Sequence, residues 1–97
     1  MKQHPDVQPY IDLLMSYNEH TNIYSKKAYD DIPFHVQDSI NIADLISNVP
    51  KTITDMGSGS GLPSVVIAIK NPKNNVIAVE SKDKKCRFLH LAKKELQ

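Results

Sequence analysis

The sequence predicts an α/β fold in which helices precede a β-α-β-α unit, and three observations support this. All three glycines of the 97-residue chain lie in one pentad, residues 57–61, directly behind an apolar strand-like segment. A second short apolar run, residues 76–79, ends at Glu80. In the stretches before, between and after these runs, the apolar residues follow the spacing of a helix. Strands that alternate with helices favour a parallel sheet with right-handed crossovers.

Two amphipathic helices are expected in the first half of the chain. The first covers about residues 7–20, where apolar positions follow the spacing i, i+3, i+4, i+7: Tyr10, Leu13, Leu14 and Tyr17. The second covers about residues 32–46, where the positions expected to face inward are Val36, Ile40, Ala43 and Ile46. It ends before Pro50, because a residue preceding proline is biased away from helical backbone angles. Residues 1–50 are therefore expected to form an N-terminal helical segment, in which Asn18 and Asn22 are interpreted as turn and cap residues.

The spacing of the apolar residues changes from Lys51 onwards, where strand-like runs alternate with helical ones. Residues 52–56 and 76–80 are expected as strands, the second of them buried, with a short helix over about 62–70 and a turn over 71–75 between them. Ser81 is a candidate N-cap for a helix over 82–96. The inward stripe expected on that helix is Cys86, Leu89, Ala92 or Lys93, and Leu96. Residues 51–97 thus form the first β-α-β-α unit of one incomplete domain, since two parallel strands cannot cover both faces and both edges of a sheet.

The glycine-rich turn indicates a ligand site. Glycine accepts positive φ and lets a ligand approach the backbone closely. A glycine turn after one strand and a carboxylate, Glu80, after the next is the arrangement of Rossmann-type nucleotide sites, where the carboxylate binds ribose hydroxyls. Leu62 stands where the third glycine of G-x-G-x-x-G belongs, which disfavours a dinucleotide. The form D-x-G-x-G-x-G, from Asp55 to Gly61, resembles the S-adenosylmethionine (SAM) loop of methyltransferases; a solvated Gly/Ser linker is the alternative interpretation.

Composition excludes several classes of protein. No apolar stretch approaches the ~20 residues that span a bilayer, and the N-terminus lacks the apolar region of a signal peptide. The one cysteine, Cys86, excludes an internal disulfide, is interpreted as a helix core residue, and fits a reducing cytoplasm, which is the expected location. No Cys/His cluster has metal-ligand spacing, so no metal site is expected.

Charge is unevenly distributed along the chain. Residues 1–50 carry three lysines against seven acids, a net −4, whereas residues 51–97 carry nine basic residues against four acids, a net +5. Six of those nine basic residues lie in 82–87 and 93–94. Such a stretch could contact phosphates. A solvated helix face accounts for the charge equally well.

Four sequence blocks together resemble the bacterial 16S ribosomal RNA guanine-N7 methyltransferase family, also called glucose-inhibited division protein B. The family pattern W-N-x-x-x-N-L-T corresponds to residues 17–24, and H-x-x-D-S-[IL] corresponds to residues 35–40. The pattern D-[VI]-G-[ST]-G-x-G-[LF]-P-G corresponds to residues 55–64, and D-S-x-x-K-[RK]-x-x-F-L to residues 80–89. The residues that depart from these patterns are Tyr17 for tryptophan, Tyr24 for threonine, Ser64 for glycine and Glu80 for aspartate.

The resemblance implies the N-terminal part of a Rossmann-like SAM-dependent methyltransferase fold that methylates N7 of a guanosine in 16S ribosomal RNA. The cofactor-binding residues it implies are Asp55, Gly57, Ser58, Gly59, Gly61, Leu62, Glu80 and Ser81. Asp55 would support the SAM ammonium group, or alternatively cap the glycine turn, and Glu80 would accept ribose hydroxyls, or alternatively be a solvated acid. Candidates for the substrate or cofactor side are His35, Asp38, Lys84 and Arg87. His35 and Asp38 could instead form a structural hydrogen-bonded pair.

No catalytic base is named, because the guanine N7 lone pair is already nucleophilic and catalysis would be mainly positioning. The expected partner is 16S ribosomal RNA or the small ribosomal subunit, with no membrane. Two other functions stay open: a non-catalytic remnant that binds RNA weakly, and a nicotinamide or flavin module. Because family members continue for several more strands, the 97 residues alone are expected to lack activity, and their exposed strand edges favour self-association.

Overall fold

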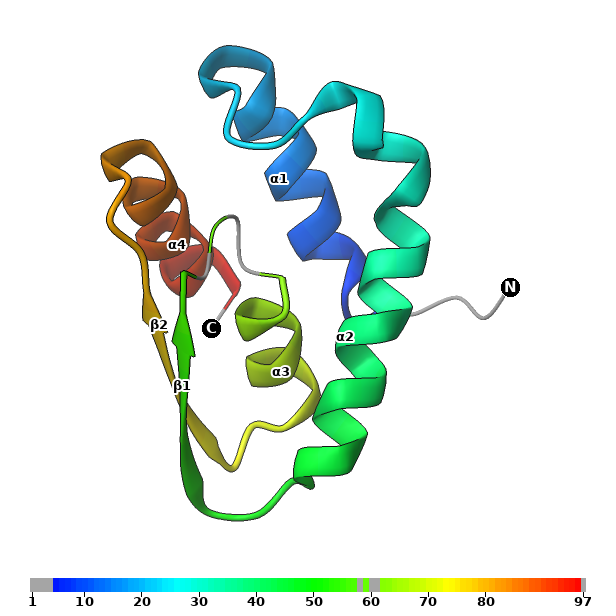
Figure 1. Ribbon diagram of the computed structural model, residues 1–97, viewed down its shortest axis with the longest axis vertical. Helices are drawn as coiled ribbons and strands as arrows, with labels where there is room; N and C mark the ends of the chain where they lie inside the picture. The colour runs from blue at the N-terminus through cyan, green and yellow to red at the C-terminus, as the bar shows by residue number, and fades with distance from the viewer. Residues whose placement is uncertain (1–4, 58, 60–61, 97) are drawn as a thin grey trace.

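The computed structural model describes residues 5–57, 59 and 62–96. In these residues the elements are α1 (Gln8–Thr21), the 3-10 helix η1 (Lys26–Asp31), α2 (Ile32–Ile46), β1 (Lys51–Met56), α3 (Ser64–Lys70), β2 (Asn74–Val79) and α4 (Asp83–Leu96) (Figure 1). The two strands are parallel and in register, from Lys51 opposite Asn74 to Met56 opposite Val79. The structure is therefore mixed α/β with a small parallel sheet, as the order of sequence periods predicts.

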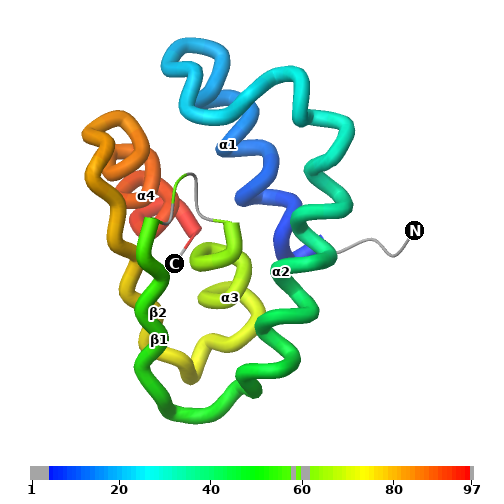
Figure 2. The backbone as a smooth tube through the Cα atoms, viewed as in Figure 1, coloured from blue at the N-terminus to red at the C-terminus, as the bar shows by residue number. Residues whose placement is uncertain are grey.

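The described helices lie on one side of the sheet, as Figure 2 shows most simply. The opposite face carries large apolar side chains that reach solvent: Met56 is 74% exposed, Ile77 44% and Val79 38%. The prediction that the second strand is buried is therefore wrong for this part of the chain. Its physical reason is that a parallel strand becomes buried only when layers cover both faces of the sheet, and one layer is present among the described residues.

The core lies between the helices and is centred on Phe88 of α4. This side chain is fully buried, and its ring centroid lies 6.2 Å from that of Tyr10 and 5.4 Å from that of Tyr17. Both tyrosines come from α1, so α4 packs against α1 as well as over the sheet. The other fully or nearly buried apolar residues of this core are Val7, Leu14, Ile23, Ile32, Val36, Ile40, Val66 and Ala92.

The inward stripe expected on the last helix is confirmed at Ala92 but misses Phe88, the most buried position of the helix. Phe88 and Ala92 are the buried positions, whereas the expected residues Cys86, Leu89 and Leu96 are only half-buried and Lys93 is exposed. Contact with α1 rotates the buried face toward Phe88.

Several boundaries also differ from expectation at the ends of the strands. β2 begins at Asn74, inside the expected turn, because the Asn74 Nδ2 donates to the Ser47 and Val49 carbonyl oxygens at 3.1 and 2.7 Å. Asn71 donates to the Ala43 carbonyl oxygen at 2.8 Å and so anchors the same turn on α2. α3 begins at Ser64, two residues later than expected.

Asn18 holds the connection between α1 and η1, an element that the sequence did not predict. Its side chain is fully buried. The Oδ1 accepts the Tyr24 N–H at 2.7 Å, and the Nδ2 donates to the Tyr24 carbonyl oxygen at 2.8 Å and to the Tyr29 hydroxyl at 2.7 Å. The interpretation of Asn18 as a turn residue is thus wrong, because it lies inside α1. Asn22 does end α1, in the left-handed conformation with φ of 53°.

Within the described residues, no helix combines the length and apolar character needed to cross a bilayer. The same part of the chain contains no group of three His, Cys, Asp or Glu side chains that could hold a metal ion.

We predict that Asn18→Ala lowers the free energy of unfolding by about 2–4 kcal/mol. The reason is that three hydrogen bonds worth about 1 kcal/mol each are lost and their partners stay partly buried. Urea unfolding followed by circular dichroism measures this. The matched control is Asn41→Ala, which removes an exposed amide bonded only to Gln37 and should cost less than about 0.5 kcal/mol. Equal losses in the two variants would contradict the role given to Asn18.

Candidate functional site

The carboxyl ends of β1 and β2 meet at one edge of the sheet, where the glycine-rich turn begins. The Gly57 N–H donates to the Val79 carbonyl oxygen at 2.7 Å, which fastens the start of the turn to the neighbouring strand. Gly57 and Gly59 have φ of +73° and +56°, a region that disfavours other residues. The need for glycine at these two positions is therefore confirmed. Ser58 and Gly61 lie outside the described residues.

The space above the turn is open. A Cβ built on Gly57 or Gly59 would meet no atom within 4 Å. Glycine at these positions is thus required by the backbone conformation and leaves the main chain accessible. A small ligand could approach the main chain closely at these two glycines, whose own N–H groups donate to the Val79 carbonyl oxygen and the Glu80 carboxylate.

Glu80 joins the glycine turn to the start of α4. Its Oε1 accepts the Gly59 N–H at 2.7 Å, across 21 residues of sequence, and its Oε2 accepts the Lys82 N–H at 2.9 Å. A carboxylate oxygen has a second lone pair, so each oxygen can still accept a hydroxyl from a ligand. Both oxygens of Glu80 are thus engaged with the backbone, and its contact with a ligand stays a prediction.

These bonds also fix the charge state of Glu80. The backbone N–H of Lys82, and next that of Gly59, lower the pKa of Glu80 below its ordinary value of 4.5, because both donors stabilise the charged form. The positive charge of Lys85 acts in the same direction. A negative charge therefore stays at the carboxyl edge of the sheet throughout the neutral range.

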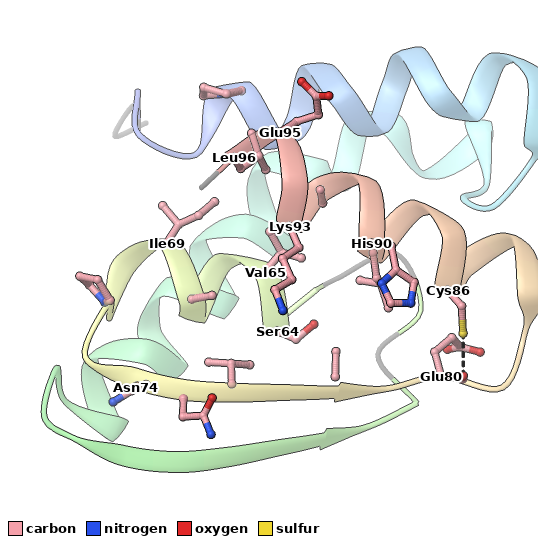
Figure 3. A pocket seen from close by; sticks show the side chains of 18 of the residues that line it. Ser64, Val65, Ile69, Asn74, Glu80, Cys86, His90, Lys93, Glu95 and Leu96 are labelled. Atoms are coloured by element: carbon pink, nitrogen blue, oxygen red, sulfur yellow. Dashed lines mark hydrogen bonds between the residues drawn. The ribbon is translucent and has the colours of Figure 1, made fainter.

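The side chain that accepts a backbone N–H at the beginning of the last helix is that of Glu80 and not that of Ser81. α4 begins at Asp83, so Lys82 precedes it and Ser81 lies one residue too early to be the N-cap. The Lys82 N–H is satisfied by the Glu80 carboxylate. The prediction of Ser81 as N-cap is therefore wrong. The thiol of Cys86 donates to the Glu80 carbonyl oxygen at 2.8 Å and gives the same corner a further contact (Figure 3).

The remaining predicted cofactor residues lie beside this edge. Asp55 is half-buried near the end of β1, paired in register with Ala78 of β2. Leu62 is half-buried and packs against the core just before α3. Ser64, where the family pattern has glycine, is 2% exposed. Its hydroxyl oxygen has no hydrogen-bond partner within the described residues, and nothing in the sequence other than the departure from the pattern marked it.

A cavity of about 900 Å³ lies between α3, β2 and α4 (Figure 3). Its lining is mostly apolar, with Val65, Ile69, Val76, Leu89 and Leu96 among its residues, and Glu80 is the predicted cofactor residue that contributes to it. Asp55, Gly57 and Gly59 do not line it. The cavity is therefore a groove between the helices and the sheet, distinct from the open space above the glycine turn.

The four residues assigned to the substrate or cofactor side are all exposed. His35 and Asp38 lie on α2, and no side-chain hydrogen bond joins them in the described structure, so their interpretation as a structural pair is wrong. The ring of His35 instead lies against Phe34, with centroids 5.8 Å apart. Lys84 and Arg87 lie on α4, near the Glu80 corner. A contact of any of the four with substrate stays a prediction.

Comparison with known proteins decides the family. The family model described as rRNA small subunit methyltransferase G, GidB, matches residues 3–97. The chain belongs to the GidB family. Relatives named ribosomal RNA small subunit methyltransferase G include proteins of Gluconobacter oxydans (39% identical over 90 residues) and Acholeplasma laidlawii (37% identical over 97 residues).

The match covers most of this chain and less than half of each of these relatives. The Gluconobacter alignment spans 92% of this chain and 46% of the relative, and the Acholeplasma alignment spans 98% and 42%. A relative from Fusobacterium nucleatum is 38% identical over 90 residues, which are 90% of this chain and 38% of that protein. No solved structure matches the chain significantly. This GidB chain therefore corresponds to the N-terminal part of these relatives.

We predict that Glu80→Gln destabilises the fold at neutral pH and that this effect disappears in acid. Since the folded-state pKa is lowered, the carboxylate stabilises the fold above pH 4.5, and this stabilisation is lost as pH falls through the folded value. Urea unfolding of wild type and variant at neutral pH, and again below the folded pKa, measures the difference.

Glu95→Gln is the matched control, because Glu95 is an exposed acid of α4, the helix that follows Glu80. Its unfolding free energy should stay close to that of the wild type at both pH values. An unfolding free energy of Glu80→Gln equal to that of the wild type at neutral pH would show that the carboxylate does not hold the turn.

Proposed function

We propose that this GidB chain provides the SAM-binding part of a methyltransferase that modifies N7 of a guanosine in 16S ribosomal RNA. The observation that carries the proposal is the junction of the glycine turn with Glu80 at the carboxyl edge of a parallel sheet. Relatives named ribosomal RNA small subunit methyltransferase G support the reaction class and the RNA substrate. The family match disfavours both a nicotinamide module and a non-catalytic remnant.

The residues present fit SAM better than a dinucleotide. The open space at Gly57 and Gly59 admits a ligand close to the main chain. The carboxylates Glu80 and Asp55 lie at the ends of adjacent strands, so the edge is acidic; this suits ribose hydroxyls and a ligand ammonium group and repels a pyrophosphate. Glu80 would hold the ribose through its remaining lone pairs, and Asp55 would lie toward the ammonium group.

The chain's contribution to catalysis is positioning. When bound, SAM supplies a methyl group already activated on a sulfonium, and the guanine N7 lone pair needs no deprotonation. The Glu80 carboxylate, held by Gly59 and Lys82, would fix one end of the cofactor so that the methyl group points in a set direction. Correct orientation alone can supply several kcal/mol of rate acceleration. The reaction therefore needs no general base from Asp55, His35 or their neighbours.

The full site belongs to a larger, Rossmann-like domain. Ligands in such folds bind where the strand order reverses beside the first strand, so β1 needs a second neighbour on its free edge. In this proposal residues 51–97 are the first β-α-β-α unit and residues 1–50 are the helical segment that covers it. The exposed face at Met56, Ile77 and Val79 would receive the helices that follow in longer relatives. A ribosomal RNA substrate supports the cytoplasm as the proposed location of the activity.

We predict that a fusion of this chain to the C-terminal part of the Gluconobacter relative transfers labelled methyl from SAM to 16S ribosomal RNA, whereas the 97 residues alone do not. In the fusion, Glu80→Gln should weaken binding of S-adenosylhomocysteine roughly 10- to 100-fold, as expected for hydrogen bonds to a charged acceptor. Calorimetry measures the affinity, with Glu95→Gln as control. Tighter binding of NAD than of S-adenosylhomocysteine would contradict the proposal.

A further inference from the structure

The outer face of α4 carries a row of basic side chains. Arg87, His90 and Lys94 follow the spacing i, i+3, i+7, and all three are exposed. Lys84 is exposed in the first turn, on the flank of this row. These four residues are called the basic stripe below. Arg87 and Lys94 lie on the side of α4 that is turned away from Phe88 and Ala92, whereas Lys84 precedes Phe88 by four residues and His90 lines the groove between α3, β2 and α4.

The positive charge of the stripe is not neutralised within the described structure. Among the described residues, the one ion pair joins Lys70 to Asp6 at 2.7 Å and involves no residue of α4. The acids of α4 are Asp83, four residues before Arg87 on the same side of the helix, and Glu95 near the end, and neither forms an ion pair with a stripe residue within the described part of the chain. Unpaired cations in a row raise the local potential and attract polyanions.

The stripe starts beside the proposed cofactor edge and is rigidly held. Lys84 is four residues after Glu80, whose carboxylate accepts the N–H of Lys82 at the start of the helix. Phe88, packed on Tyr10 and Tyr17, fixes the rotation of α4 about its own axis. At 1.5 Å per residue, Arg87 and Lys94 lie about 10 Å apart along the helix. The row can therefore contact more than one phosphate of a single backbone.

We propose that the basic stripe binds the phosphate backbone of the RNA substrate and guides it to the carboxyl edge of the sheet. This inference rests on the proposed function for the identity of the polyanion. A lipid surface suits the stripe less well, because a membrane-binding helix must expose its apolar face. The apolar face of α4 is packed against α1 through Phe88. The exposed residues of the helix are polar or charged.

The test is the affinity of the 97-residue chain for a fluorescein-labelled 16S ribosomal RNA hairpin, measured by anisotropy over a range of salt concentrations. In Arg87→Ala/Lys94→Ala the affinity should fall about tenfold or more at low salt. The slope of log affinity against log salt should fall by roughly 1.5, since each phosphate contact contributes about 0.7–0.9. Alanine is the best helix former, so α4 should persist.

Lys26→Ala/Lys27→Ala is the matched control, since it removes two exposed positive charges from η1. Affinity and salt slope should stay near the wild-type values in this control. The inference is overturned if the two double variants lose affinity equally, if Arg87→Ala/Lys94→Ala binds as tightly as wild type, or if the chain binds phosphatidylglycerol vesicles and no RNA. RNA binding that depends on the stripe, in a fusion that binds no S-adenosylhomocysteine, would support the inference and contradict the proposed function.

Discussion

The Glu80 carboxylate connects three parts of this GidB chain that would otherwise be independent. Glu80 directly follows β2, and its carboxylate accepts the N–H of Gly59 in the glycine turn and the N–H of Lys82 at the start of α4. Both donors are backbone groups that the local secondary structure leaves unsatisfied, and a charged acceptor binds them more strongly than a neutral one. The open backbone at the glycines, the acidic edge and the direction of α4 all depend on this one group.

The helix that follows Glu80, α4, has two faces with different surroundings. The inner face, through Phe88, packs on α1 and ties the N-terminal helices to the sheet. The outer face, with Arg87 and Lys94, carries unpaired positive charge away from the cofactor edge. The acidic edge and the basic helix are thus adjacent but separate, which suits the proposed binding of a cationic cofactor beside a polyanionic substrate. In the proposed function, the uncovered side of the sheet would receive elements from the part of the relatives that this chain does not span.

Sequence periodicity predicted the elements that depend on local pattern. α2 has the expected bounds, and the glycines at 57 and 59 have the positive φ that their clustering implied. Features set by tertiary contact could not be predicted in the same way. The burial of Phe88 depends on where α1 lies, and the central role of Asn18 depends on a 3-10 helix with no strong sequence signal. Glu80 was predicted at the correct edge, but its bonds to Gly59 and Lys82 required coordinates.

The most direct test is an NMR titration of the Gly59 and Lys82 amides in acid. If Glu80 accepts both N–H groups, the two amide signals should move together with one shared midpoint, below pH 4.5, because protonation of one carboxylate weakens both bonds. Glu80→Gln should abolish the shared transition. Amide signals that do not move, that move with separate midpoints, or that keep the same transition in the variant would contradict the account.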